Sequence, residues 1–309
     1  MVEEMRLKTK DLLTLNELDK AELLGLVDTA IRMKKELRRG ISRPLLKNKT
    51  LAMIFQKPST RTRVSFETGV FQLGGHALNL SADDLQLKRG ETIEDTAKTL
   101  SRYVDIIMAR VYSHEELELL ARNAEVPVIN GLSDSFHPCQ ILADLMTMKE
   151  RKKKLAGLKL AWIGDGNNVC NSMIYGCAKA GIEMRIATPK GYEPNAQVVR
   201  ESSRLGEIRI SNSPEAAARG ADVVVTDTFV SIHHQTTDRT NDFLPKFQVN
   251  SALMKKADPS AIFMHCLPAK RGQEVTSDVI DGPQSAVWDE AENRLHAQKA
   301  LMAALLSKA

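Results

Sequence analysis

The chain has 309 residues, enough for about two domains of ordinary size. Hydrophobic residues make up 43% and charged residues 27%, a balance that excludes a largely disordered or fibrous chain. The net charge is only +4 and aromatic residues make up 5%, so the composition argues against a nucleic-acid-binding protein.

The first half of the chain alternates helical and strand patterns. Leucines at helical spacing predict a helix within the first forty residues, with Asn16 as its N-cap. Uninterrupted apolar runs then predict strands, and each is followed by polar residues and a helical pattern. The expected elements are a strand at 51–55, a helix at 62–73, strands at 104–109 and 127–130, and a helix at 139–148.

The same alternation restarts after a charged segment at 149–154, which we interpret as a solvated helix end or linker. Apolar strands that alternate with helices predict parallel sheets covered on both faces. We therefore expect an α/β protein with two similar doubly wound domains that meet near residue 150. The expected elements are a strand at 158–163, a glycine-containing loop at 164–168, a helix at 169–180, and strands at 184–187, 221–226 and 261–265.

The cysteines and the N-terminal residues indicate the compartment. The first ten residues lack an apolar stretch, and no apolar run is long enough to cross a bilayer, so we expect neither a signal peptide nor membrane association. The cysteines contain no Cys-x-x-Cys pair, which argues against a structural zinc site or a disulfide framework. Free thiols fit the reducing cytoplasm. The four cysteines are Cys139, Cys170, Cys177 and Cys266.

Ligands of open α/β sheets bind beyond the carboxyl ends of the strands, so the residues there are the first candidates. The segment Ser59-Thr60-Arg61-Thr62-Arg63 offers a helix start, hydroxyls and guanidiniums, which suit a phosphate. A capped helix with solvent-facing arginines would give the same pattern. Arg110 ends an apolar strand, and His137 precedes a proline at a helix start, where it could donate to a polarised oxygen.

The strand ends of the second half carry amide, carboxylate and thiol groups. The loop Gly164–Asn168 resembles the start of a dinucleotide fingerprint, but the third glycine and the later acidic residue are missing, which disfavours NAD. Asn168 could instead hold a small ligand by its amide. Asp227 could bind an ammonium group or cap a turn. His265 and Cys266 are adjacent on a strand and point to opposite faces, so they are poorly placed as base and nucleophile.

Taken in order, these motifs resemble those of the ornithine carbamoyltransferases within the wider aspartate/ornithine carbamoyltransferase family. The resemblance runs from about residue 10 to the C-terminus. It implies that carbamoyl phosphate and L-ornithine react to give L-citrulline and phosphate, a step of arginine metabolism, without a cofactor or a metal ion. The motifs are STRTR (59–63), HPCQ (137–140), DGNN (165–168), Asp227 with Ser231, HCLP (265–268) and WDEAENRLHAQ (288–298).

The resemblance also assigns residues to each substrate, position by position. For catalysis it implies Arg61, Arg110, His137, Cys266 and Arg294. For L-ornithine it implies Asn168, Asp227, Ser231 and Ile232. For carbamoyl phosphate it implies Ser59, Thr60, Arg61, Thr62, Gln86, Arg110, His137, Pro138, Cys139, Gln140, Cys266, Leu267 and Arg294.

The resemblance also implies how the chain is divided into domains and how its subunits assemble. The resemblance implies a carbamoyl phosphate-binding domain at residues 1–148 and an ornithine-binding domain at 149–289, joined by interdomain helices. A C-terminal helix at about 290–309 is expected to pack back on the first domain. It further implies a homotrimer or a multiple of trimers with shared active sites, in which Gln86 reaches a neighbouring subunit's site.

One segment departs from the family pattern and leaves alternatives open. The usual Ser-Met-Gly is here Ser231-Ile232-His233, which replaces a flexible glycine, and the loop is about one residue shorter. Another carbamoyl acceptor, such as putrescine or N-acetylornithine, is therefore the main alternative. A Rossmann dehydrogenase and a non-catalytic protein that retains the fold are further alternatives. The anabolic or catabolic direction is left open.

Overall fold

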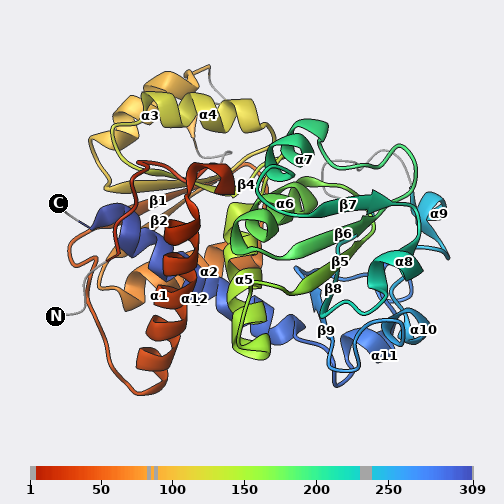
Figure 1. Cartoon of the computed structure of the whole chain (residues 1–309). Helices are drawn as coiled ribbons and strands as arrows, with labels where there is room; N and C mark the ends of the chain where they lie inside the picture. Colours follow the sequence, from red (N-terminus) through yellow and green to blue (C-terminus); the bar gives the residue numbers. More distant parts are fainter. Residues whose placement is uncertain (1–4, 82–84, 87–89, 230–238, 308–309) are drawn as a thin grey trace. The chain divides into compact units, whose positions relative to one another are not determined.

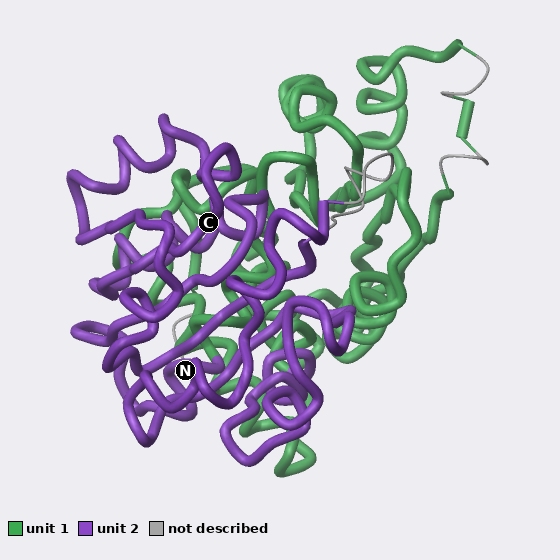
Figure 2. Tube along the Cα trace, turned by 90° about the vertical axis from the view of Figure 1, so that its right-hand side faces the viewer, with its two compact units in different colours: residues 1–146, 293–309 green, residues 147–292 purple. Residues whose placement is uncertain are grey.

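The computed structural model describes residues 5–81, 85–86, 90–229 and 239–307. The chain divides into two compact units, which Figure 2 distinguishes by colour. Unit 1 comprises residues 1–146 and 293–309, and unit 2 comprises residues 147–292. No helix in the described part of the chain is long and apolar enough to cross a membrane.

Unit 1 is built on a four-stranded sheet in the order β2-β1-β3-β4, with all strands parallel. Its strands are β1 (Thr50–Phe55), β2 (His76–Ser81), β3 (Ile106–Arg110) and β4 (Val128–Leu132). Its helices are the 3-10 turn η1 (Leu15–Glu17), α1 (Lys20–Arg38), α2 (Thr60–Gln72), α3 (Ile93–Ser101), α4 (His114–Asn123), and most of α5 (Pro138–Lys152) and of α12 (Val287–Leu306).

Helices cover both faces of this sheet (Figure 1). Side chains alternate between the faces of a strand. Ala52 and Ile54 of β1 accordingly share a buried cluster with Leu117 and Leu120 of α4, on the face that α3 and α4 cover. Burial on both sides explains why β1 is apolar from Leu51 onward.

Unit 2 is built on a five-stranded parallel sheet in the order β7-β6-β5-β8-β9. Ala217, Leu253 and Val279, from three short helices, form one buried cluster with alternate residues of the sheet. Its strands are β5 (Lys159–Ile163), β6 (Glu183–Ala187), β7 (Ile208–Ser211), β8 (Val223–Thr226) and β9 (Ile262–His265). Its helices are α6 (Asn168–Ala180), α7 (Ala196–Ser202), α8 (Pro214–Ala218), α9 (Thr240–Phe243), α10 (Ser251–Met254) and α11 (Ser277–Ile280).

The predicted fold class is confirmed: both units are α/β with wholly parallel sheets, and α5 and α12 each have residues in both units. The N-cap assigned to Asn16 is wrong. Thr14 caps η1, and Asp19 caps α1 in a reciprocal arrangement with Glu22, which satisfies the first backbone N–H groups of the long helix. The charged cluster at 149–154 begins as the last turn of α5, as expected for a solvated helix end.

Candidate functional site

The turn between β1 and α2 is a capped helix start, as its sequence predicted. The Ser59 hydroxyl accepts a hydrogen bond from the Thr62 backbone N–H (3.3 Å) and donates to the Thr62 hydroxyl (3.1 Å). Thr60 is exposed and Arg61 half-buried, while Thr62 is buried. A cavity of about 700 Å³ lies against this turn and is lined by Ser59, Thr60 and Arg63 among others. A helix N-terminus with hydroxyls beside a cavity suits an anion.

Arg110, His137 and Arg294 are all buried, and they belong to β3, to the residue before α5, and to α12. Burial lowers the pKa of His137 well below its usual range, and the positive charges of Arg294, Arg110 and Arg61 lower it further. Such an effect requires the three guanidiniums to lie near the ring. The imidazole is therefore neutral, and it sits among cations that suit a phosphate.

Arg294 is held in place by amide groups. Its Nη1 donates to Gln140 Oε1 (2.9 Å) and its Nε donates to Gln298 Oε1 (2.9 Å). The Gln140 amide in turn donates to Asp144 Oδ1 (2.8 Å). These bonds fix the plane of the guanidinium, which is what a preorganised anion site requires. They also bring together two predicted residues that lie far apart in the sequence.

The remaining predicted residues of unit 1 are Pro138, Cys139 and Gln86. Pro138 opens α5, and the Cys139 thiol turns into the core, where it donates to the Asn130 carbonyl (3.3 Å). Burial raises the pKa of Cys139 to about 12, so it is no nucleophile. Gln86 is exposed on a short described stretch, where its carbonyl accepts the Glu91 N–H (3.2 Å).

Lys57 was missed by sequence reasoning. It lies directly before the capped turn, is only 4% exposed, and its ammonium stands 4.0 Å from the centre of the Tyr112 ring. Burial, together with the Arg110 charge, lowers the pKa of Lys57 to about 8, against an opposing effect of Asp134. A lysine two residues beyond an apolar strand was the available signal, and Lys57 adds a further cation near Arg110.

In unit 2, the buried Asp227 carboxylate collects hydrogen bonds from three neighbouring strand ends. It accepts from Asn167 Nδ2 (2.8 Å), from the Thr228 N–H (2.8 Å) and from Cys266 Sγ (3.1 Å). The strands β5, β8 and β9, which precede these residues, are adjacent in the sheet. The structure thus brings together Asp227 and Cys266, both predicted, and adds Asn167.

The two asparagines of the predicted loop have different roles. Asn167 caps α6, accepting from the N–H groups of Val169 (3.0 Å) and Cys170 (3.1 Å), while Asn168 is the buried first residue of that helix. Gly166 serves packing: a Cβ there would come within 2.2 Å of the Pro194 nitrogen. The glycine therefore admits the close approach of a neighbouring loop.

Asp165 supplies a second carboxylate close to Asp227. Burial raises the pKa of Asp165 to about 7; the Arg239 guanidinium opposes this rise and the Asp227 carboxylate adds to it. Arg239 also lies over the Tyr192 ring, 5.2 Å from its centre. This end of the sheet in unit 2 is thus carboxylate-rich and suits an ammonium group.

Asp165 is expected to lower stability at neutral pH. Its folded-state pKa of about 7 lies above its ordinary value of 3.8, so between these pH values the folded chain keeps a proton that the unfolded chain has released. Stability from this group therefore falls as the pH rises through that window. Asp165→Asn should stabilise the protein by on the order of 2 kcal/mol at pH 8 and by much less at pH 4, measured by denaturant unfolding at both pH values.

Asp258 provides the matched control with the opposite sign. Hydrogen bonds from Ser260 lower its pKa, so Asp258→Asn should lose stability, and only above the pH at which the carboxyl ionises. An equal gain for Asp165→Asn at pH 4 and pH 8 would contradict the assigned burial of the charge.

Two predicted positions, Ser231 and Ile232, lie outside the described residues. Among the described residues, the ligand atoms of Asp227, His265 and Cys266 lie within 4.8 Å of one another, a spacing that a metal ion could bridge. However, His265 Nδ1 accepts the Leu267 N–H (2.9 Å), and its Nε2 faces Glu274 Oε1 (3.2 Å). Both ring nitrogens are therefore engaged, and we assign no metal to this group.

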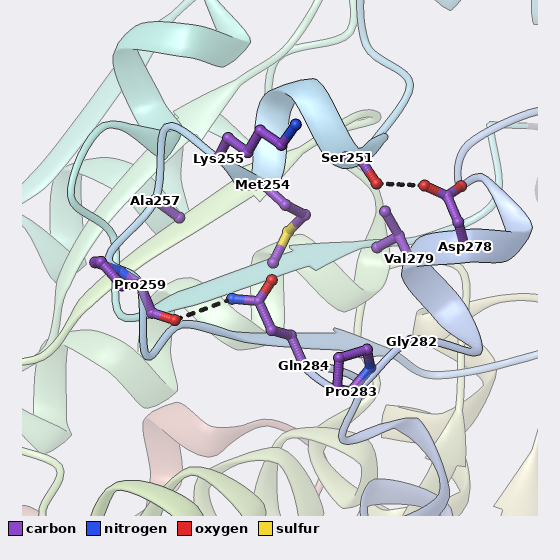
Figure 3. A pocket seen from close by; sticks show the side chains of 10 residues that line it. All are labelled: Ser251, Met254, Lys255, Ala257, Pro259, Asp278, Val279, Gly282, Pro283 and Gln284. Carbon is purple, nitrogen blue, oxygen red and sulfur yellow. Dashed lines mark hydrogen bonds between the residues drawn. The ribbon is translucent and has the colours of Figure 1, made fainter.

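A separate cavity of about 400 Å³ lies beside α10 and α11 in unit 2 (Figure 3). Several of its polar side chains bond within the protein: Ser251 donates to Asp278, and Gln284 Nε2 donates to the Ala261 carbonyl (3.0 Å) and to the Pro259 carbonyl (3.5 Å). Because these groups satisfy one another, the three of them offer few further polar contacts to a ligand.

Comparison with known proteins gives matches to both units. Residues 10–150 match the carbamoyl-P binding domain of aspartate/ornithine carbamoyltransferase, and residues 156–305 match its Asp/Orn binding domain. The chain is 62% identical to an ornithine carbamoyltransferase of Cenarchaeum symbiosum, over 97% of this chain and 99% of that protein. It is 54% identical to the enzyme of the same description from Carboxydothermus hydrogenoformans, over 96% of this chain and 97% of that protein.

Solved structures give the same result. An ornithine carbamoyltransferase from Pyrococcus furiosus superposes with a TM-score of 0.89 at 51% identity, covering 97% of this chain and 96% of that one. An anabolic ornithine carbamoyltransferase from Campylobacter jejuni superposes with a TM-score of 0.90 at 41% identity, covering 96% of this chain and 99% of that one.

Proposed function

The chain belongs to the aspartate/ornithine carbamoyltransferase family, and from that premise we propose that it transfers the carbamoyl group of carbamoyl phosphate to the δ-amino group of L-ornithine, giving L-citrulline and phosphate. The enzyme is a carbamoyltransferase. The observation that carries the choice of substrates is the contrast in charge. Three arginines lie near His137 in unit 1, whereas in unit 2 the Asp227 carboxylate has the Asp165 carboxyl group near it and accepts hydrogen bonds from Asn167 and Cys266.

We assign carbamoyl phosphate to the cationic site of unit 1. The start of α2 and Arg61 hold the phosphate and stabilise its charge as it leaves. Arg110 and the neutral His137 donate hydrogen bonds to the carbamoyl oxygen as it becomes an oxyanion, and Gln140 orients Arg294 toward the same anion. The remaining contacts proposed for this substrate come from Ser59, Thr60, Thr62, Pro138, Cys139, Cys266 and Leu267, and from Gln86 of a neighbouring subunit.

We assign ornithine to the site around Asp227. Its carboxylate binds the α-ammonium group, and Asn168, Ser231 and Ile232 complete the proposed contacts, with Cys266 beside the δ-nitrogen. The δ-ammonium loses a proton, and the neutral amine then attacks the carbamoyl carbon while that carbon's bond to the phosphate oxygen breaks. No covalent enzyme intermediate is needed, so catalysis consists mainly of positioning and charge stabilisation.

Formation of the carbamoylated amine from carbamoyl phosphate tests this function, and with L-ornithine that product is L-citrulline. L-ornithine, putrescine and N-acetylornithine are offered in parallel to the purified protein. N-acetylornithine lacks the α-ammonium group that Asp227 is proposed to bind, so it should be used far less well than L-ornithine. Putrescine keeps its ammonium groups but lacks the α-carboxylate, so it tests whether the site also requires that carboxylate. Equal or better use of either alternative amine would overturn the assignment of the acceptor.

We further propose that the chain assembles as a homotrimer or a multiple of trimers. Val64 and Phe71 lie seven residues apart on one face of α2 and are 53% and 77% exposed, and Leu78 on the edge strand β2 is 40% exposed. Exposed apolar side chains on neighbouring elements are typical of an interface. Gln86 lies a few residues beyond this strand, which suits a contribution to a neighbouring active site.

Phe71→Glu should break this assembly, because the interface would bury an unpaired carboxylate. Sedimentation velocity should show a fall from a trimer-based mass towards the 34.3 kDa chain, together with loss of citrulline formation. Tyr103→Glu is the control, since Tyr103 is equally exposed (75%) but follows α3, away from these residues in the sequence. A wild-type protein that is monomeric and fully active would exclude the shared-site assembly.

We place the domains as the family suggests, with carbamoyl phosphate bound by residues 1–148 and ornithine by residues 149–289. The buried thiols of Cys139, Cys170 and Cys177 are not joined in disulfides, which suits a reducing compartment, so we propose a cytoplasmic enzyme of arginine biosynthesis.

A further inference from the structure

The turn that follows β9 is held by a buried histidine. The His265 side chain has no exposed surface, and all three of its nitrogens make hydrogen bonds. Its backbone N–H donates to Glu290 Oε2 (2.8 Å), Nδ1 meets the Leu267 N–H (2.9 Å), and Nε2 meets Glu274 Oε1 (3.2 Å). The imidazole thus links the strand end to the residue two places further along the chain.

These contacts define the state of the ring. A backbone N–H can only donate, so Nδ1 of His265 must be the acceptor and carries no proton. The ring proton is therefore on Nε2, which donates to the Glu274 carboxylate. His265 is neutral in this arrangement, and Glu274 selects its tautomer, as a carboxylate does for histidines in functional sites.

Glu274 is fully buried. Its Oε1 accepts both from His265 and from the Lys270 N–H (2.5 Å), and its Oε2 has no hydrogen-bond partner among the described residues. Burial of a carboxylate with one unsatisfied oxygen is unfavourable, and it persists only where the surrounding structure compensates for it. The arrangement therefore points to a role beyond packing.

The residue that His265 holds has an unusual backbone conformation. Leu267 has φ = 58°, in the left-handed region that L side chains rarely adopt. Its N–H bond to the imidazole fixes this conformation. Between the two, Cys266 directs its thiol to Asp227 Oδ1 at 3.1 Å, so the same turn sets the contact between the thiol and the proposed ornithine carboxylate.

We propose that His265 and Glu274 are positioning residues for carbamoyl transfer: Glu274 fixes the tautomer of His265, and His265 holds the 265–267 turn so that Cys266 and Leu267 face the reacting groups. This proposal rests on the proposed function. It concerns residues that do not themselves touch either substrate. A displacement of about 1 Å in such a turn is enough to cost on the order of 10²-fold in rate.

Two substitutions at His265 test the roles of its two ring nitrogens separately. In His265→Asn the amide oxygen takes the place of Nδ1 and accepts the Leu267 N–H, whereas in His265→Gln the amide group takes the place of Nε2 and reaches Glu274 only. We expect kcat for citrulline formation to fall less than tenfold in His265→Asn and about 10²-fold in His265→Gln. The dissociation constant of inorganic phosphate, which unit 1 holds, should stay within twofold of wild type in both.

Two substitutions at Glu274 provide a second, independent test. Glu274→Gln keeps an oxygen that accepts the imidazole N–H, so kcat should stay within about threefold of wild type. Glu274→Leu removes this acceptor, so the tautomer of His265 is no longer fixed and kcat should fall at least tenfold. Phosphate binding should be unchanged in both variants. Equal kcat for His265→Asn and His265→Gln, or for Glu274→Gln and Glu274→Leu, would overturn the proposal. Absence of citrulline formation by the wild-type enzyme would instead refute the proposed function itself.

Discussion

Arg110→Ala is expected to lower kcat by about 10²–10³-fold, because the variant loses the donor that we propose for the oxyanion on the carbamoyl oxygen. Arg110 is the last residue of β3, is 8% exposed, and lies close enough to His137 and Lys57 to lower the pKa of each. The same substitution should therefore raise the pKa of Lys57 above 8, because a neighbouring positive charge has gone. Steady-state citrulline formation measures kcat, and the pH dependence of Lys57 labelling by an amine reagent measures the shift.

Arg102→Ala is the matched control for this variant. Arg102 is exposed at the end of α3, where it pairs with Glu125 on the surface (3.2 Å), so its removal should leave kcat unchanged. A kcat for Arg110→Ala within threefold of wild type would show that Arg110 does not stabilise the transition state.

Asp227→Asn should lower kcat/KM for ornithine by about 10²-fold or more, while the dissociation constant of carbamoyl phosphate stays within twofold of wild type. The substitution removes the charge proposed to bind the α-ammonium group. In the wild type, Asn167 Nδ2 and the Cys266 thiol both donate to the Asp227 carboxylate. The new asparagine places its own NH₂ donor opposite one of these two donors, so one hydrogen bond is lost. Initial rates with varied ornithine, together with calorimetric titration of carbamoyl phosphate, separate the two effects.

Asp222→Asn serves as the control on the same strand. Asp222 precedes β8 at the opposite end from Asp227, and its carboxylate accepts the backbone N–H of Lys159 (2.8 Å). An asparagine oxygen can replace that acceptor, so kcat/KM should not change. If Asp227→Asn weakened both substrates equally, the separation of the two binding sites between units would be wrong.

The strands that could be predicted are those buried on both faces. Their apolar runs are uninterrupted, as in β1 and β5, because helices cover both sides of each sheet. In contrast, β2 has the sequence His-Ala-Leu-Asn-Leu-Ser and exposes half of its side chains, so its pattern does not differ from that of a loop. The short strand β7 carries an arginine and a serine on the sheet edge and was missed for the same reason.

The site residues that could be predicted from the sequence are charged residues at the carboxyl end of an apolar strand, such as Arg110 and Asp227. Other parts depend on tertiary contacts. No local pattern in the sequence shows that Arg294 lies beside Gln140. Arg294 was predicted as a site residue from the family resemblance alone. Asn167 was missed in favour of Asn168 because a helix cap that also binds a distant carboxylate is visible only once β8 lies beside β5.

The order in which unit 1 is completed follows from its discontinuity in the sequence. Its last segment, residues 293–309, supplies Arg294 and the Gln298 amide, which donates to the Ser65 hydroxyl of α2 (2.8 Å). Unit 2 is a single continuous stretch, whereas unit 1 is completed by residues 293–309, which follow unit 2 in the chain, so a growing chain has all of unit 2 before it has all of unit 1. The proposed carbamoyl phosphate site is therefore incomplete until residues 293–309 have been added, because they supply Arg294 and the amide that holds it.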